Sequence, residues 1–280
     1  MELIDDYEHI NADIEYVLEN VLSEQTNCGI GDESIKLKEL YNSVLINACT
    51  CESSCSHLST CPHGEAYVWN DKYRELVIRP ERESDLIYEC SSNCTCKLED
   101  CSNRLVQRGP RKNLQIFLSS QYQSYGVITK QDIPQGAFIC EYAGELLTCG
   151  EAKLRIQENE KKGNMNYILC LKENHHVDLA GGELKPGSEL MTIVDPSKRG
   201  NIGRYLNHSC DPNCQIYSVR VDCPIPKVAI FAKRHIKTGE ELCFHYNDGK
   251  KYSSTSASGK PTLCLCNSKK CQKYLPNLEI

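Results

Sequence analysis

The sequence lacks the features that mark membrane proteins, secreted proteins and proteins that coat nucleic acids. No run among its 280 residues approaches the roughly 18 apolar residues that a membrane span needs, so we expect a soluble, intracellular protein. Residues 1–22 carry seven acidic side chains and no basic or apolar segment, so no signal peptide is visible and the thiols should stay reduced. The net charge of −6 leaves no basic surplus for sequence-independent DNA binding.

The mild acidity has two interpretations. An acidic surface suits a basic peptide better than DNA, but the same charge is ordinary for cytosolic proteins. No basic recognition helix follows the cysteine-rich segments, so we expect no direct sequence-specific DNA binding.

Cysteine, by contrast, is abundant, with 19 residues. In a reduced protein this number favours metal binding over a disulfide framework. Eight of the cysteines form two close groups, namely Cys49, Cys51, Cys55 and Cys61, then Cys90, Cys94, Cys96 and Cys101. Such spacings let neighbouring thiolates share a tetrahedral zinc ion, whereas cysteines separated by one residue rarely form a disulfide. Residues 49–101 have few apolar runs and therefore need a zinc staple in order to fold.

From residue 114 onward, short apolar runs alternate with glycine, proline and aspartate turns, which predicts a mostly β domain. The predicted strands are 114–118, 126–129, 137–142, 166–171, 215–221 and 227–232. Residues 151–162 are typical of a helix, 172–190 of a polar insertion loop and 249–261 of a flexible linker.

An apolar stripe near the N-terminus predicts one more helix. Ile14, Val17, Leu18, Val21 and Leu22 recur at the spacing of an amphipathic helix. Residues 1–48 are too short for a separate recognition module, so we expect an extension whose helix packs on the catalytic body. Binding of a partner is the alternative.

Three motifs in the second half of the chain carry a resemblance to a known family. They are Arg204-Tyr205-Leu206-Asn207-His208-Ser209-Cys210 followed by Asp211-Pro212-Asn213, then Glu240-Glu241-Leu242-Cys243-Phe244-His245-Tyr246, then Cys264-x-Cys266-x4-Cys271. With the earlier cysteine groups, they resemble the SET-domain protein lysine methyltransferases that carry pre-SET and post-SET zinc modules. Residues 200–204 and 274–276 look most like the methyltransferase half of SETMAR-type proteins, and the resemblance covers residues 49–275.

The resemblance implies a fold and a division of the chain. The fold is mostly β, with the small sheets and knot-like C-terminal segment of the SET domain, flanked by the two zinc modules. The implied units are an N-terminal extension with an amphipathic helix (1–48), a pre-SET zinc cluster (49–102), a SET catalytic domain (103–248), and a linker with a post-SET zinc loop (249–280).

The resemblance also implies S-adenosylmethionine as cofactor. Asn207 and His208 match residues that bind its amino-acid part and adenine, and residues 124–126 stand where the family has Gly-Trp-Gly. The changes at the first two of these positions put cofactor affinity in question. The implied cofactor-binding residues are Ser124, Tyr125, Gly126, Arg204, Asn207, His208, Tyr246 and Tyr274, of which Tyr274 is alternatively a surface aromatic.

Three aromatic residues match the catalytic channel of the family. Tyr246 matches the catalytic tyrosine, whose hydroxyl orients the amine, and Tyr167 resembles the second channel tyrosine, with an ordinary core aromatic as its alternative. Phe244 occupies the position that tunes how many methyl groups fit, and phenylalanine there implies multiple methylation. His245 replaces a usual acidic or amide residue, so it either shifts the pH dependence or faces outward.

In the family, nine pre-SET cysteines hold three zinc ions, and this chain has eight of them. His63, His57 or Cys28 would supply the missing ligand; otherwise the cluster holds two ions or is loosened. In the post-SET module, Cys210 would join Cys264, Cys266 and Cys271, so we expect about three zinc ions in the first module and one in the second. The remaining cysteines are expected to be small core residues, namely Cys140, Cys149, Cys170, Cys214, Cys223 and Cys243.

The implied function is transfer of methyl groups from S-adenosylmethionine to a lysine of the histone H3 tail or nucleosome, in the nucleus and on the chromosome. The module order favours lysine nine, and lysine thirty-six is possible because the SETMAR type has been linked to it. Two alternatives remain at this point, a methyltransferase of a non-histone lysine and a catalytically weak chromatin-binding scaffold.

Overall fold

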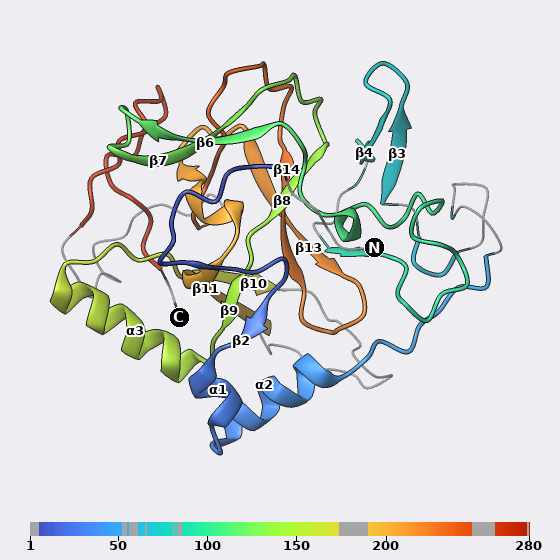
Figure 1. Ribbon diagram of the computed structural model, residues 1–280, viewed down its shortest axis with the longest axis horizontal. Helices are drawn as coiled ribbons and strands as arrows, with labels where there is room; N and C mark the ends of the chain where they lie inside the picture. The colour runs from blue at the N-terminus through green and yellow to red at the C-terminus, as the bar shows by residue number, and fades with distance from the viewer. Residues whose placement is uncertain are drawn as a thin grey trace.

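The computed structural model describes residues 6–51, 55, 61–64, 66–80, 82, 86–173, 190–247, 261–278 and 280. Short strands in several small sheets dominate the described part of the chain, and the three longer helices lie along one side in Figure 1. The predicted mostly β fold is therefore confirmed. The predicted linker lies outside the described residues except for its last residue, and so does the predicted insertion except at its two ends. None of the helices described is long and apolar enough to span a bilayer.

The first sheet carries the longest strand at its centre. Its order is β1-β11-β9-β2, with β10 also paired to β11. The strands are β1 (Glu15–Tyr16), β2 (Val21–Leu22), β9 (Gly144–Leu146), β10 (Leu169–Glu173) and β11 (Leu190–Gly200). β9 and β10 run antiparallel to β11, whereas β1 and β2 run parallel to their partners.

The second sheet has the order β5-β13-β14-β8, and three two-stranded ribbons complete the β structure. The strands of the sheet are β5 (Leu86–Tyr88), β8 (Phe138–Glu141), β13 (Cys214–Arg220) and β14 (Lys227–Ala232). The ribbons pair β3 (Tyr67–Asn70) with β4 (Glu75–Ile78), β6 (Leu114–Ser119) with β7 (Ser124–Thr129), and β12 (Asn207–His208) with β15 (Cys243–Phe244). Five of the six predicted strands are confirmed as β6, β7, β8, β13 and β14, while the sixth, 166–171, begins only at Leu169.

The predicted N-terminal helix over residues 14–22 is wrong. This segment forms β1 and β2, which add to β11 and β9, and the backbone N–H of Val17 donates to the Gly200 carbonyl at 3.0 Å. Most stability of a short helix comes from tertiary packing, and here the sheet offers unpaired backbone groups that a strand satisfies better. Ile14, Val17 and Val21 are β-branched, which further favours strand over helix. The expected packing against the body of the protein is therefore made through strands.

Helices follow at α1 (Glu24–Cys28) and α2 (Asp32–Asn42), and the predicted helix over 151–162 is confirmed as α3 (Cys149–Lys162). Local signals explain α3. The Thr148 hydroxyl caps its first turn by accepting from the Glu151 N–H, and Gly163 ends it in the left-handed conformation with φ of 67°. Short 3-10 helices span Val106–Arg108 and Ile202–Tyr205.

The main core lies between the two sheets and includes the segments that carry the C-terminal motifs. Leu206, just before β12, and Phe244 in β15 are each 1% exposed and belong to the same apolar cluster as Val127 and Ile139. The backbone of the candidate site is therefore part of the core. Among the cysteines expected to be core residues, Cys140, Cys214 and Cys243 are buried, whereas Cys149, Cys170 and Cys223 are half-buried.

A buried ion pair joins the two sheets. The fully buried guanidinium of Arg220, at the end of β13, donates to both carboxylate oxygens of Glu173, at the end of β10, at 2.9 and 2.6 Å. Its Nε donates to the Pro224 carbonyl at 2.7 Å. The two-pronged geometry suits a planar guanidinium, and each charge is uncompensated without the other.

We expect Arg220→Met to lower the free energy of unfolding by about 3–5 kcal/mol, because the buried Glu173 carboxylate then has no partner. The double variant Arg220→Met/Glu173→Met should regain most of that loss, because apolar residues of similar volume often replace a buried ion pair at little cost. Urea unfolding followed by circular dichroism measures both. A double variant as unstable as the single one would assign the loss to packing instead of charge.

Candidate functional site

The site is built around two dipeptides that lie side by side although they are far apart in the sequence. β12 and β15 pair in parallel, with Asn207 opposite Cys243 and His208 opposite Phe244. The Ser209 N–H continues the ladder by donating to the Phe244 carbonyl at 3.0 Å. The first and second motifs therefore share one small sheet.

Asn213 holds this crossing in place. Its buried side chain donates from Nδ2 to the Glu241 carbonyl at 2.8 Å and accepts at Oδ1 from the Cys243 N–H at 2.9 Å. A side-chain amide thus acts as a strand partner for the segment that leads to Tyr246. Asn213 was not predicted to be a site residue, although its position directly after the first motif could have indicated one.

The predicted cofactor-binding residues of β7 and β12 come together. The Asn207 side chain accepts from the Ser124 hydroxyl at 3.2 Å and donates to the Tyr125 carbonyl at 3.1 Å. At Gly126, an added Cβ would lie 2.3 Å from the nearer carboxylate oxygen of Glu241, so any larger residue would displace the Glu241 side chain. The cradle between these strands offers backbone and side-chain polar groups at close approach, which suits a zwitterionic amino-acid moiety such as that of S-adenosylmethionine.

An aromatic cluster lies on the other side of the crossing. The Tyr246 ring is 5.0 Å from the Phe244 ring between centroids, and the Tyr246 hydroxyl donates to the Leu206 carbonyl at 3.1 Å. Burial raises the pKa of Tyr246, so its hydroxyl keeps its proton at neutral pH. This group is therefore suited to orienting a substrate and not to serving as an ionised base.

Tyr142 belongs to the same cluster, although it was not among the residues that the family resemblance assigned to the channel. Its ring meets the Phe244 ring edge to face with centroids 5.9 Å apart, and its hydroxyl donates to the Tyr167 carbonyl. Burial, followed by the charge of Tyr246, raises the pKa of Tyr142. Tyr142 therefore links the three predicted channel residues. Its position in the Glu141-Tyr142-Ala143-Gly144 run was the available signal.

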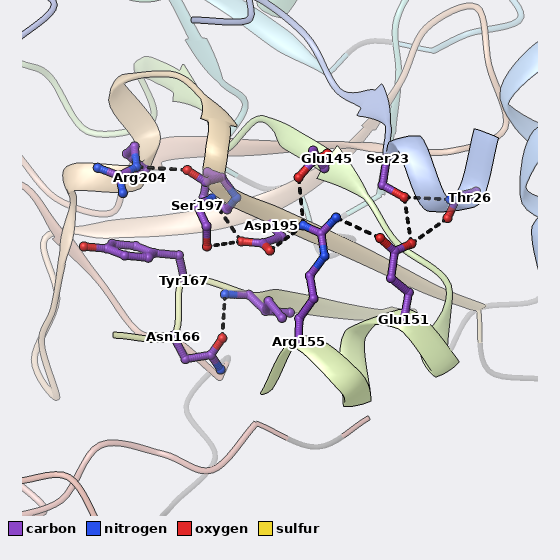
Figure 2. A network of polar contacts seen from close by, with 12 residues as sticks. Ser23, Thr26, Glu145, Glu151, Arg155, Asn166, Tyr167, Asp195, Ser197 and Arg204 are labelled. Atoms are coloured by element: carbon purple, nitrogen blue, oxygen red, sulfur yellow. Dashed lines mark hydrogen bonds and ion pairs between the residues drawn. The ribbon is translucent and has the colours of Figure 1, made fainter. Parts of the chain in front are cut away.

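Tyr167 and Arg204 meet face to face (Figure 2). The Arg204 guanidinium carbon lies 4.3 Å from the centre of the Tyr167 ring and 4.8 Å from that of Tyr205. Its Nε donates to the Pro196 carbonyl at 3.0 Å. The Arg204 side chain is thus buried against a channel tyrosine, as a cation over an aromatic face.

His208 and His245 lie side by side, with ring centroids 4.7 Å apart. Burial, and then the charge of His245, lowers the pKa of His208 to about 4. His208 is therefore neutral at physiological pH, and its Nδ1 accepts from the Tyr246 N–H at 3.2 Å. His245 is half-buried against this ring, which does not match the outward orientation considered from the sequence.

The C-terminal cysteine site consists of Cys210, Cys264, Cys266 and Cys271, whose sulfur atoms all lie within 4.8 Å of one another. The Sγ atoms of Cys210 and Cys264 are 3.8 Å apart, which equals the separation of about 3.8 Å expected in a tetrahedron with zinc–sulfur bonds of about 2.3 Å. Burial opposes ionisation of Cys266, but hydrogen bonds from Ser268 and a backbone N–H outweigh it and lower the pKa of the thiol to about 6. The residues present fit a structural zinc ion.

The C-terminal cysteine site also anchors the chain end near the cofactor-binding residues. Gln121, in the turn between β6 and β7, donates to the Cys266 carbonyl at 3.0 Å. Half-buried Tyr274 is bridged to Leu263 on the same loop. The position of Tyr274 therefore depends on the site that closes the loop.

The first cysteine cluster, Cys49, Cys51, Cys55, Cys61, Cys90, Cys94, Cys96 and Cys101, forms a core of its own made of sulfur. From Cys49 Sγ, the distances to the sulfurs of Cys55, Cys90 and Cys96 are 3.6, 3.9 and 3.8 Å. Each is far longer than a disulfide bond of about 2.05 Å. Hydrogen bonding with Cys90 lowers the pKa of Cys101 to about 4, although burial opposes it, whereas burial raises the pKa of Cys55 and Cys61. The close packing of eight sulfur atoms fits a multinuclear zinc cluster.

His63 is the candidate ninth ligand that the structure brings to this cluster. Its Nδ1 lies 3.6 Å from Cys61 Sγ and 3.8 Å from Cys90 Sγ, and it can share an ion with Cys49, Cys90 and Cys94. Cys28 is exposed on α1 and belongs to none of the possible metal groups among the described residues. The other candidate, His57, lies outside those residues.

Comparison with known proteins gives one consistent answer. Residues 124–247 match the SET domain and residues 2–104 match the Pre-SET motif. The probable histone-lysine N-methyltransferase set-23 of Caenorhabditis elegans is 41% identical over 235 residues, which cover 83% of this chain and 88% of the relative. The methyltransferase domain of human SETMAR superposes with a TM-score of 0.68 at 30% identity, over 95% of this chain and 90% of that one. Arabidopsis thaliana SUVH6 in complex with SAM gives 0.69 at 28% identity, over 97% and 52%.

Proposed function

The chain belongs to the SET-domain family of histone-lysine N-methyltransferases, and from that premise we propose that it di- or trimethylates a lysine of histone H3, with lysine nine favoured over lysine thirty-six. That it is an S-adenosylmethionine-dependent protein-lysine N-methyltransferase follows from its relatives. The observation that carries the proposal is the pairing of β12 with β15, which places Asn207 beside the strand that leads into Phe244 and Tyr246. The proposed location is the nucleus, on the chromosome.

The cofactor is proposed to lie against β7 and β12. Asn207 and the backbone around Gly126 would hold its amino-acid part, His208 would contact it through the backbone, and Tyr274 would close over the adenine. When bound, S-adenosylmethionine supplies a methyl group on a positively charged sulfur for in-line displacement by the lysine nitrogen. Ser124 retains a hydrogen bond to Asn207 where the family has glycine, so the substitution is compatible with an ordered site.

The channel residues would deliver the lysine as a neutral amine. A free lysine has a pKa of about 10.4, and a dry aromatic channel disfavours the charged ammonium. The Tyr246 hydroxyl, protonated and bonded to the Leu206 carbonyl, has lone pairs left to accept from the amine and fix its direction. Tyr142 and Tyr167 would form the wall, and alignment of the two reacting groups supplies most of the rate.

We expect purified parent chain, incubated with S-adenosylmethionine and recombinant nucleosomes, to produce methyl-lysine on histone H3. Tyr246→Phe should lower the rate by roughly 10²-fold or more while leaving cofactor binding in place, because it removes only the orienting hydroxyl. Mass spectrometry of H3 peptides identifies the lysine and counts the methyl groups. Product on other proteins alone would indicate a non-histone substrate, and cofactor binding without any product would indicate a scaffold.

We expect Phe244→Tyr to shift the product from di- and trimethyl-lysine towards monomethyl-lysine. The Phe244 ring is fully packed between Tyr142 and Tyr246, so an added hydroxyl takes up space that a second methyl group needs. Mass spectrometry at matched extents of the first methylation measures the shift. An unchanged ratio of products would mean that Phe244 does not border the methyl groups.

We further propose that the first cysteine cluster holds about three zinc ions and the C-terminal cysteine site one. Three tetrahedral ions need twelve ligand positions, which eight thiolates and one imidazole fill if three thiolates bridge. Cys49, Cys55 and Cys90 each belong to more than one possible metal group and are the proposed bridges. His63 is the proposed terminal ligand that replaces the missing cysteine.

The proposed role of His63 predicts a specific loss of metal. We expect the His63→Ala variant to bind about one zinc ion fewer per chain than the parent. The His63→Cys variant should regain the zinc content of the parent, because it completes a set of nine thiolates. Cys28→Ser is the matched control, because Cys28 is exposed and outside the metal groups. Zinc is measured by inductively coupled plasma mass spectrometry on purified protein. Full zinc content in His63→Ala would assign the position to another residue.

A further inference from the structure

Figure 2 shows a cluster of charged side chains around Arg155, in the same view as the predicted site residues Tyr167 and Arg204. The Arg155 guanidinium, from α3, contacts the carboxylates of Glu145, Glu151 and Asp195 at 2.7, 2.8 and 2.7 Å. The three carboxylates belong to β9, α3 and β11 and are almost inaccessible to water. Burial alone would lower the pKa of Arg155, but the hydrogen bonds that it donates to Glu145 and Asp195 outweigh burial and raise this pKa. One cation therefore holds three elements together.

This cluster contains three carboxylates and one cation, so the additional negative charge needs hydrogen-bond donors. Two of these donors come from the N-terminal segment. The hydroxyls of Ser23 and Thr26 donate to the same oxygen of Glu151 at 2.7 and 2.8 Å, and both residues are buried. Water cannot replace them at such depth without rearrangement. The N-terminal segment thus stabilises a carboxylate that belongs to α3.

The N-terminal donors are held firmly in place. β2 pairs with β9, and the Ser23 N–H donates to the Leu146 carbonyl at 3.2 Å. The Ser23 hydroxyl also caps α1 by accepting from the Thr26 N–H at 2.9 Å. The strand and the cap together fix both hydroxyls relative to β9, which also carries Glu145.

A series of contacts connects the Asp195 carboxylate of the cluster with Tyr167, the predicted channel residue. The Asp195 carboxylate accepts from both the N–H and the hydroxyl of Ser197, which fixes the backbone of residues 195–197 within β11, where the register with β9 shifts. The carbonyl of Pro196 in this part of β11 accepts from Arg204, whose guanidinium lies over the Tyr167 ring. A shift of the Asp195 carboxylate therefore moves the carbonyl that positions Arg204.

We propose that Ser23, Thr26 and Arg155 are positioning residues for the lysine channel, acting on Tyr167 through residues 195–197 of β11 and through Arg204. The inference rests on the proposed function, because it takes Tyr167 as a wall of the channel. In this view the N-terminal segment is a part of the catalytic apparatus, although its two donors, Ser23 and Thr26, contact Glu151 and not the predicted channel residues.

The test is Thr26→Val, which keeps the shape of the side chain and removes one donor to Glu151. We expect kcat on an H3 peptide to fall about tenfold, while the peptide KM and the Kd of S-adenosylmethionine change less than about twofold, because a misplaced channel group acts mainly on the transition state. Thr26→Ser retains the hydroxyl and should restore kcat. Glu151→Gln, which keeps the acceptor but weakens the contact with Arg155, should act in the same direction if Thr26→Val folds poorly.

Tyr67→Phe is the matched control. The buried Tyr67 hydroxyl donates to the buried carboxylate of Glu89 at 2.7 Å, so the substitution removes the same kind of bond elsewhere. Tyr67→Phe should lower the free energy of unfolding, as Thr26→Val does, but it should leave kcat unchanged. If neither Thr26→Val nor Tyr67→Phe lowers kcat, or if both lower it to the same extent, Thr26 contributes only to general stability and the inference is overturned.

A double-mutant cycle with Tyr167→Phe completes the test. If the N-terminal donors act by positioning the Tyr167 hydroxyl, the fold decrease in kcat caused by Thr26→Val should be much smaller in the Tyr167→Phe background than in the parent. Additive penalties would contradict the proposed route. A parent chain that makes no methyl-lysine on any substrate would instead refute the proposed function, and the positioning role with it.

Discussion

The parallel pairing of β12 with β15 is the constraint on which the rest of the site depends. A ladder of two residues per strand contributes little stability by itself, so it persists only because its surroundings leave no alternative. Leu206 and Phe244 fix it from the core, and the Asn213 amide fixes it from the side. Once this pairing exists, the two segments that carry the proposed cofactor-binding and catalytic residues, which are distant in the sequence, belong to one small sheet.

Clusters of charged groups and of cysteine sulfur atoms join segments of this chain that are distant in the sequence. The first cysteine cluster is a core of thiols, and the Arg155 cluster and the Arg220–Glu173 pair join separate sheets and helices. Each of these centres is strongly directional, because a guanidinium or a zinc ion accepts partners only in certain positions. Interactions with a fixed geometry hold distant segments in defined positions, which suits an enzyme whose rate depends on the alignment of its reacting groups.

Short apolar runs between turns predicted β6, β7, β8, β13 and β14, and the cysteine spacing predicted the first cysteine cluster, because both are local signals. The C-terminal cysteine site and the grouping of Asn207 with Phe244 and Tyr246 were implied only by the family resemblance, and the longest strand, β11, was not predicted. The prediction of a helix failed at residues 14–22, where a stripe with helical spacing forms strands, because pairing with β9 and β11 is not visible in the segment itself. Arg155 and Asn213 were likewise missed. An arginine in a charged helix looks like a solvated residue until the fold surrounds it with three carboxylates.

Cys210 follows Asn207 and His208 closely in the sequence, and its sulfur atom lies near those of Cys264, Cys266 and Cys271, which are synthesised much later. Cys271 follows Cys210 by 61 residues, which a ribosome adds in roughly 3–12 s at about 5–20 residues per second. During synthesis, the strand that carries Asn207 and His208 therefore emerges before the loop that carries Cys264, Cys266 and Cys271. The C-terminal cysteine site is thus completed only after translation of Cys271, so any function that depends on the whole site begins after nearly all of this sequence has been made.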